Sequence, residues 1–197
     1  MRGIAAARPV GYCGGMKELY VPAPGEIVVL HTPPREAQLS LVARLALGGP
    51  LLVLDAGNEF DAYRVARLIG RHTRHVDHVL QQVHVARAFT CYQVVALFEQ
   101  LPATPMPHVI FDLPATFYDE SVPPGESRRL LRLVLQHVER LRQGAPLVIS
   151  VRPIRTRWSP RHGPVNPRAD LLTAILDLAD HVFIWERPAP VPPVRLF

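Results

Sequence analysis

The sequence is poor in lysine, in cysteine and in long apolar runs. Of its 22 basic residues Lys17 is the only lysine, so arginine carries the formal charge of +5. Arginine suits bidentate phosphate contacts better than lysine does, although a GC-rich genome would also favour its codons. Cys13 and Cys91 are isolated and show no metal-ligand spacing, which fits a reducing compartment. No apolar run approaches the roughly 20 residues that span a bilayer, so we expect a cytoplasmic protein without membrane contact.

What the sequence does contain is an alternation of strand and helix patterns along its 197 residues. Short apolar runs predict buried strands, and apolar residues at helical spacing predict the helices between them. This alternation predicts a three-layer α/β/α domain with a mostly parallel central sheet. We place that single domain at residues 1–187, with an irregular stretch at 1–25, and a proline-rich tail at 188–197. We expect strands at 27–30, 51–54, 79–85, 108–112, 147–151 and 181–186, and helices at 36–47, 62–72, 91–101, 126–142 and 171–180.

The turn after the first of these strands lacks the residues of a phosphate-binding loop. Residues 31–40 contain no glycine and no lysine. A P-loop needs glycines whose N–H groups wrap a phosphate, a lysine for the outer phosphates and a Ser or Thr for the metal. The scaffold of a nucleotide-binding protein is therefore predicted without its phosphate cradle.

Five segments follow one another in a distinctive order and spacing. They read GGMKELY at 14–20 with PGEI at 24–27, LDAGNEF at 54–60, VHVARAFTCYQ at 83–93, VIFD at 109–112 and LVISVR at 147–152. In that order they resemble the ATPase core of the RecA family, and most closely its archaeal and eukaryotic recombinase branch, the RadA type. The resemblance covers residues 14–187. It implies a RecA-like fold and a role in DNA repair or recombination.

The nucleotide-binding positions of that family are altered in this chain. The position of the P-loop lysine falls on Gln38, and that of the metal-binding hydroxyl falls on Leu39, with Ser40 one place away. We expect no cofactor, and ATP with magnesium only if the degenerate site still binds it. The resemblance places that vestigial site at Thr32, Arg35, Gln38, Ser40 and Asp112.

The catalytic positions are altered as well. The family's catalytic glutamate falls on Gly57, with Glu59 two residues later, and the glutamine that senses the γ-phosphate falls on Arg152. Asp112 alone matches the family, as the Walker B acid, and would either hold a metal through water or cap a strand end. Phosphoryl transfer depends on positioning and charge neutralisation. We therefore predict a degenerate ATPase with no catalytic residue and no metal site.

A basic segment follows the last of the five motifs. Residues 152–168 contain five arginines and a tryptophan but no acid. Arginines contact phosphates, an aromatic ring can stack on a base, and the resembling family carries a DNA-contacting loop at this position. We predict single-stranded DNA binding here, the alternative being a solvated loop with its tryptophan folded onto the core. The predicted contacts are Arg152, Arg155, Arg157, Trp158, Arg161 and Arg168.

Two further features have a structural interpretation. His72, His75 and His78 recur at every third residue, and we interpret them as the basic end of a helix rather than as a metal site. Phe89 lies in the segment that resembles the recombinase family, and we expect it in the core.

Together these features predict an accessory protein of DNA repair or recombination. It would bind DNA, a recombinase or a repair protein without hydrolysing ATP. One alternative is a regulator that acts by protein contacts alone, like the cell-division inhibitor SulA and the mutasome component ImuA, which are RecA-like but lack a P-loop. The other alternative is a divergent ATP-dependent DNA-binding ATPase that uses Arg35 and Ser40 in an unfamiliar cradle.

Overall fold

A seven-stranded sheet, in which every pair of neighbouring strands runs parallel, forms the centre of the protein. The computed structural model describes residues 10–12, 22–154, 157–159, 163–165 and 168–185. The strand order is β1-β9-β2-β6-β5-β3-β4, and β7 and β8 form a separate antiparallel hairpin. The strands are β1 (Val10–Tyr12), β2 (Ile27–His31), β3 (Leu51–Asp55), β4 (Val83–Arg87), β5 (His108–Phe111), β6 (Leu147–Val151), β7 (Arg157–Ser159), β8 (Gly163–Val165) and β9 (His181–Ile184).

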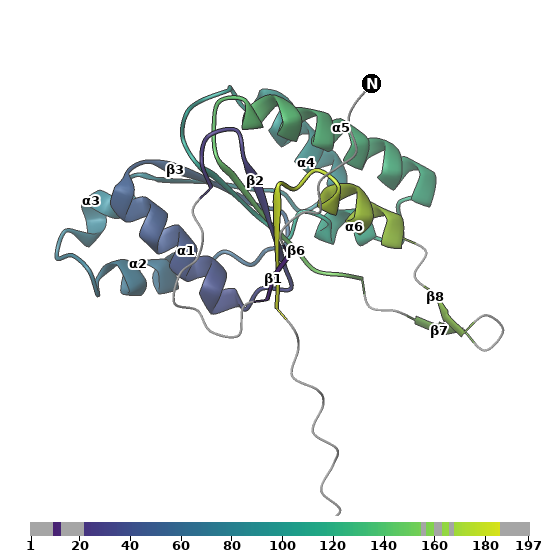
Figure 1. Cartoon of the computed structure of the whole chain (residues 1–197), viewed down its shortest axis with the longest axis horizontal. Helices are drawn as coiled ribbons and strands as arrows, with labels where there is room; N and C mark the ends of the chain where they lie inside the picture. Colours follow the sequence, from purple (N-terminus) through teal and green to yellow (C-terminus); the bar gives the residue numbers. More distant parts are fainter. Residues whose placement is uncertain (1–9, 13–21, 155–156, 160–162, 166–167, 186–197) are drawn as a thin grey trace, which may run out of the picture.

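Helices cover both faces of this sheet, so the predicted three-layer α/β/α fold is confirmed (Figure 1). One face carries α1 (Arg35–Gly48), α2 (Ala62–Ile69) and α3 (Val76–Leu80). The other carries α4 (Cys91–Gln100), the 3-10 turn η1 (Ala115–Tyr118), α5 (Pro124–Arg142) and α6 (Ala169–Leu176). None of the described helices is long and apolar enough to cross a bilayer.

The apolar sequences of the strands follow from the helices that cover both faces of the sheet. Along β3, Val53 packs with residues of α1–α3, whereas its neighbour Leu54 packs with the cluster of α4 and α5. Successive side chains of a strand point to opposite faces, so a strand that is covered on both faces needs an apolar residue at nearly every position. Charged groups are thereby confined to the strand ends and to the outer sides of the helices.

Three short elements differ from the sequence prediction. Residues 1–25 were expected to be irregular, yet β1 pairs with β9 at one edge of the sheet. The helix expected at 62–72 ends at Ile69, and α3 precedes β4 where a strand had been expected from residue 79. The basic segment contains the hairpin β7–β8. These elements lack the continuous apolar run that predicts the central strands, so the sequence pattern did not reveal them. The tail predicted at 188–197 lies outside the described residues.

Arg168, which was predicted to contact DNA, is a buried structural residue, and this corrects its assignment. Its side chain is 4% exposed and precedes α6. Because the guanidinium is enclosed and bonded to main-chain carbonyls, it ties α6 to η1 and to the start of α5 instead of facing a phosphate. It donates to the carbonyl oxygens of Phe117, Asp119 (2.7 Å) and Val122 (2.6 Å) and to the Ser127 hydroxyl (3.2 Å).

Replacing Arg168 by methionine should therefore destabilise the fold by at least about 2 kcal/mol, because several buried carbonyls lose their donor. Arg168→Lys should restore little of this, since an ammonium cannot reproduce the planar fork of donors. Urea denaturation measures both. The exposed Arg132 of α5 provides the control: Arg132→Met should change the free energy of unfolding by no more than about 0.5 kcal/mol. Equal effects at the two positions would contradict the structural role of Arg168.

Candidate functional site

The carboxyl edge of the sheet is the place where this fold offers a site. The neighbouring strands β2 and β6 send their connections to opposite faces, β2 to α1 and β6 to the hairpin and α6. In open α/β sheets such a switch point leaves a crevice at the carboxyl ends of the strands, and ligands bind there. The family resemblance places its nucleotide site at the same edge.

The backbone at this edge adopts left-handed conformations at three non-glycine residues. Thr32 follows β2 with φ 53°, Asn58 lies in the loop after β3 with φ 55°, and Asp112 follows β5 with φ 44°. Asn and Asp tolerate such values, whereas a β-branched Thr does so rarely. Thr32 is held by its N–H, which donates to the Val151 carbonyl (2.8 Å), and by its hydroxyl, which donates to the Trp185 carbonyl (2.7 Å). Conformations of this kind cluster at functional sites.

The turn between β2 and α1 forms no phosphate cradle. It consists only of Thr32, Pro33 and Pro34, and the two prolines lack an N–H. Gln38, at the position of the P-loop lysine, is 2% exposed and belongs to the buried side of α1. Ser40 is half-buried on the same helix. The structure thus does not gather these side chains around a common phosphate position.

Arg35 is also engaged within the protein. Its Nε donates to the Glu59 carbonyl oxygen at 2.9 Å, and its Nη2 lies 3.7 Å from an oxygen of Asp61. These contacts fasten the start of α1 to the loop that follows β3. An arginine in this arrangement positions the loop rather than presenting a free guanidinium.

Arg152 lies between two carboxylates at the centre of the edge. Its Nη1 is 2.7 Å from Glu59 Oε1 and 3.6 Å from Asp112 Oδ2. Its backbone N–H donates to Asp112 Oδ1 at 3.0 Å. A guanidinium thus lies beside Asp112, which matches the Walker B acid of the resembling family, and beside Glu59, which lies two residues after the position of that family's catalytic glutamate. We call Glu59, Asp112 and Arg152 the edge triad.

The position of the family's catalytic glutamate has no room for a side chain. A Cβ on Gly57 would lie 2.6 Å from the Asp112 Cβ, well inside van der Waals contact. Glu59, two residues later, points its carboxylate at Arg152 instead. Its ion pair with Arg152 engages this carboxylate within the protein.

Asp55 is a buried acid whose role the sequence analysis missed. Its side chain is fully buried and accepts from the N–H groups of Glu59 (2.9 Å) and Phe60 (3.1 Å). Arg87 Nε donates to it at 2.9 Å. Buried charges persist when paired and hydrogen-bonded in this way. An acid directly after a wholly apolar strand was the available signal, and it marks the residue that fixes the Glu59 loop.

The charged form of the Asp112 carboxyl is disfavoured in the folded protein. Burial raises the pKa of its carboxyl to about 6, the Arg152 guanidinium opposes this shift, and the Glu59 charge adds to it. Burial and the Asp112 charge likewise raise the pKa of the nearby Tyr118 phenol, which stays protonated. The edge triad consequently holds a proton-sensitive acid beside a fixed cation. It does not form an open ligand set for a divalent metal.

The structure does not bring the six predicted DNA contacts together as one exposed cluster. Arg152 belongs to the edge triad, and Arg168 is enclosed by η1 and α5. The other four lie in the segment 153–167, which we call the hairpin segment. Arg157 and Trp158 are in β7, whereas Arg155 and Arg161 lie outside the described residues.

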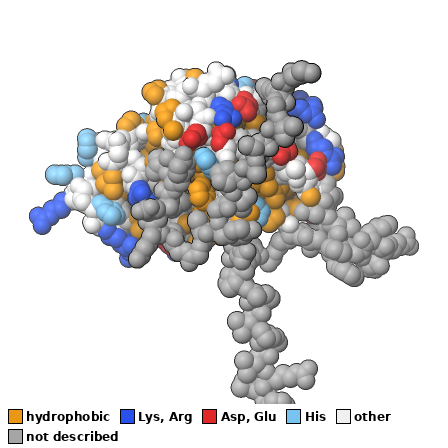
Figure 2. Space-filling view, in the orientation of Figure 1, with side chains coloured by type: hydrophobic (Ala, Val, Ile, Leu, Met, Phe, Trp, Pro, Cys, Tyr) orange, Lys and Arg blue, Asp and Glu red, His pale blue; other side chains and the backbone are white. Residues whose placement is uncertain are grey.

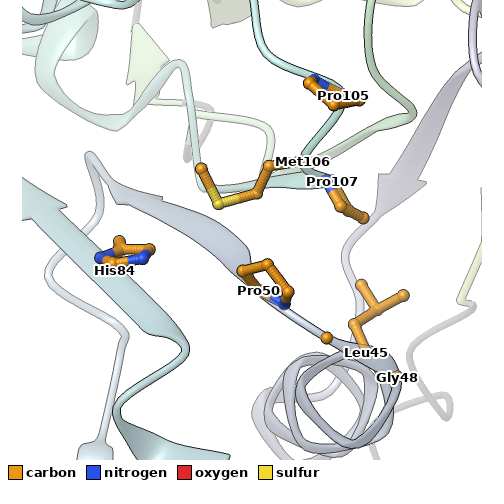
Figure 3. A pocket seen from close by; sticks show the side chains of 8 residues that line it. Leu45, Gly48, Pro50, His84, Pro105, Met106 and Pro107 are labelled. Atoms are coloured by element: carbon orange, nitrogen blue, oxygen red, sulfur yellow. The ribbon is translucent and has the colours of Figure 1, made fainter.

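A hollow of about 490 Å³ lies at the opposite edge of the sheet, where β3 and β5 begin (Figure 3). It is open and largely apolar, and His84 is its one ionisable lining residue. This composition offers no set of groups for acid–base or metal chemistry. The lining residues are Leu45, Gly48, Gly49, Pro50, His84, Pro105, Met106 and Pro107.

No protein-family model matches this chain, and no curated protein sequence matches it. The resemblance of its five segments to the RecA family therefore stays a prediction from the sequence.

Replacing Asp112 by asparagine should stabilise the protein at pH 7.5 by about 1–3 kcal/mol. The folded-state pKa of Asp112, about 6, lies above that of an unfolded aspartate. The unfolded chain therefore binds fewer protons between about pH 4 and 6, and stability falls as the pH rises through that window. The variant removes this loss, and Asn tolerates the left-handed backbone. The melting temperatures of the wild type and of Asp112→Asn, measured as a function of pH, should differ above pH 6 and coincide below about pH 4.

The exposed Asp119 gives a control of opposite sign. Hydrogen bonds from Ser121 lower the pKa of its carboxyl, so Asp119→Asn should reduce stability at neutral pH instead of increasing it. A destabilised Asp112→Asn protein at pH 7.5 would contradict the electrostatic cost at the edge triad.

Proposed function

We propose that this protein is a non-hydrolytic nucleic-acid-binding protein that acts as an accessory in DNA repair or recombination. The RecA-type order of its motifs supports the setting, and the confirmed three-layer fold is compatible with it. Its mode of action is inferred from the carboxyl edge, where the described residues lack the groups that bind a phosphate and activate water.

The observation that carries this proposal is the guanidinium of Arg152 between Glu59 and Asp112. In a phosphoryl-transfer site, metal and water occupy the space beside such acids, and an outer lysine neutralises the phosphates. Here an internal cation neutralises the acids, Gly57 has no space for a catalytic side chain, and the preceding turn has no cradle. The chemical groups of an ATPase are thus replaced by groups that hold the loops in place.

The hairpin segment supplies the nucleic-acid contact in this proposal. With Arg152 and Arg168 engaged inside the fold, its cations are Arg155, Arg157 and Arg161, beside Trp158. Each phosphate that an arginine neutralises releases a counterion, and the indole ring offers a stacking surface for a base. The contact is then independent of ATP.

A labelled single-stranded oligonucleotide should bind with an affinity that falls with salt, at a log–log slope of about −2 for three arginine contacts. Arg157→Gln should make this slope shallower by about 0.7, whereas Trp158→Ala should cost about 1–3 kcal/mol at an unchanged slope. ATP with magnesium should leave the affinity unchanged and should release no heat in a calorimetric titration.

Fluorescence anisotropy measures these quantities. Micromolar binding of ATP would overturn the non-hydrolytic part of the proposal. A wild-type protein that binds no oligonucleotide even at low salt would overturn the nucleic-acid part.

The edge strand β4 favours a second function, a contact with a protein partner. β4 ends the sheet, so the main-chain groups of its outer side have no neighbouring strand among the described residues. Exposed large apolar side chains lie beside it, namely Val85 (45% exposed), Phe89 (66%) and Tyr92 (53%). The expectation that Phe89 is in the core is therefore wrong. Its N–H donates to the Gln93 side chain, and this contact fixes the tight turn into α4 that leaves the ring outside. Unpaired strand edges and exposed apolar patches are typical of protein interfaces.

Phe89→Ser should weaken binding to the recombinase of the source organism by at least tenfold, because an exposed aromatic anchor contributes strongly to such an interface. Surface plasmon resonance measures the affinity, and Leu47→Ser, at an exposed apolar residue of α1, provides the control. Equal binding by both variants would count against this surface. Light scattering that showed long homopolymers dependent on Phe89 would instead identify the partner as a second copy.

A further inference from the structure

A row of arginines runs along the outer side of α2 and the turn after it. Its members are three, four and three residues apart: Arg64 and Arg67 lie in α2, and Arg71 and Arg74 lie in the turn and bend that follow it. Between residues 62 and 85 the chain holds four arginines and four histidines but a single acid, Asp77. Figure 2 shows the blue and pale-blue side chains at the end of the molecule where Figure 1 labels α2 and α3. The α2 arginine row consists of Arg64, Arg67, Arg71 and Arg74, all exposed.

Most of this row has no partner within the described part of the chain. Arg64 pairs with Glu36 and Asp61, whereas no described carboxylate lies within ion-pair distance of Arg67, Arg71 or Arg74. Two of these like charges lie in the eight-residue α2 and two just after it, where they repel one another and form no ion pair with a described carboxylate apart from those of Arg64. The row therefore adds nothing evident to the stability of the fold, and an anionic ligand would remove the repulsion.

The row also borders a hollow. Arg64, Arg67 and Arg71 line a space of about 370 Å³ between α1 and α2, together with Glu36 and Leu68. Guanidinium groups bind phosphate oxygens through two parallel hydrogen bonds. With Arg64 paired to Glu36, the guanidinium groups of Arg67 and Arg71 remain at this hollow, and they suit an anionic ligand such as a phosphate.

An exposed aromatic ring stands beside the arginines. Tyr63 is 74% exposed and lies four residues before Arg67, so both side chains project from the same side of α2. Rings that alternate with cations are typical of surfaces that hold single strands, since every base has a face that can stack. An anionic membrane fits less well, because membrane-surface helices expose an apolar face. The apolar residues Val65 and Ile69 of α2 are instead buried in the core.

We propose that the α2 arginine row and Tyr63 form a second contact surface for single-stranded nucleic acid. The hairpin β7–β8 projects from the opposite end of the molecule (Figure 1). The inference rests on the proposed nucleic-acid-binding function and adds a second site to it. Arg67, Arg71 and Arg74 contact backbone phosphates, and Tyr63 stacks on a base.

The test measures binding of a fluorescein-labelled oligothymidylate to the full chain at several salt concentrations. The triple variant Arg67→Gln/Arg71→Gln/Arg74→Gln should make the log–log salt slope shallower by about 2, or 0.7 for each of three contacts. Tyr63→Ala should weaken binding by about fivefold or more at an unchanged slope. The substitutions are at exposed positions, so the melting temperatures should stay at the wild-type value.

Single substitutions provide the matched control. Arg71→Gln and Arg132→Gln each remove one exposed cation, from the turn after α2 and from α5 on the other face of the sheet. Only Arg71→Gln should change the slope if the α2 surface binds the strand, whereas equal slopes for the two variants overturn the inference and indicate a general effect of net charge.

Variants of the hairpin segment separate the two sites. If Arg157→Gln and Trp158→Ala lose affinity while the α2 variants bind like wild type, the second surface is refuted and the proposed function stands. If the α2 variants lose affinity while the hairpin variants do not, the second surface stands and the hairpin assignment fails. A wild-type chain that binds no oligonucleotide refutes both. Binding to phosphatidylserine vesicles is measured as well. If the α2 variants lose vesicle binding but keep oligonucleotide binding, the inference is overturned in favour of a membrane surface.

Discussion

Burial of the central sheet on both faces is the constraint on which the rest of this structure depends. A strand such as β3 has no side that can face water, so its first polar group is Asp55 at its very end. The same holds for β5, which ends just before Asp112. Acids are therefore concentrated at the carboxyl edge, where the strands release the chain into loops. The negative charges of these acids must then be neutralised by cationic groups that lie only a few ångströms away.

Arginine provides that balance. Arg87 pairs with Asp55, Arg35 contacts the Glu59 loop, and Arg152 completes the edge triad. A divalent metal could neutralise two acids at such a place, but it would have to be recruited from solution, whereas a guanidinium is always present and always charged. The arrangement holds the loops without a ligand, and it leaves the Asp112 carboxyl with a raised pKa as a residual cost.

Two surfaces of the described residues remain for partners. The exposed side of β4 and the α2 arginine row each present exposed side chains that are not buried in the core. The exposed side of β4 and the α2 arginine row lie on the β3–β4 side of the sheet, with α3 between α2 and β4 in the chain. The proposed protein and nucleic-acid contacts would therefore be neighbours on this side of the molecule.

The sequence by itself determined the class of fold and the loss of the phosphate cradle. Apolar runs and helical spacing are local properties, and so is a turn that has neither the glycines nor the lysine of a P-loop. Only the tertiary structure decided that Arg168 is buried, because in the sequence it looks like any other arginine of a basic segment. The same is true of Phe89, whose exposure depends on the edge position of β4, and of Arg152, whose acidic partners Glu59 and Asp112 come from two other strands. Burial and charge pairing arise between segments that are distant in the chain, so no local pattern could reveal them.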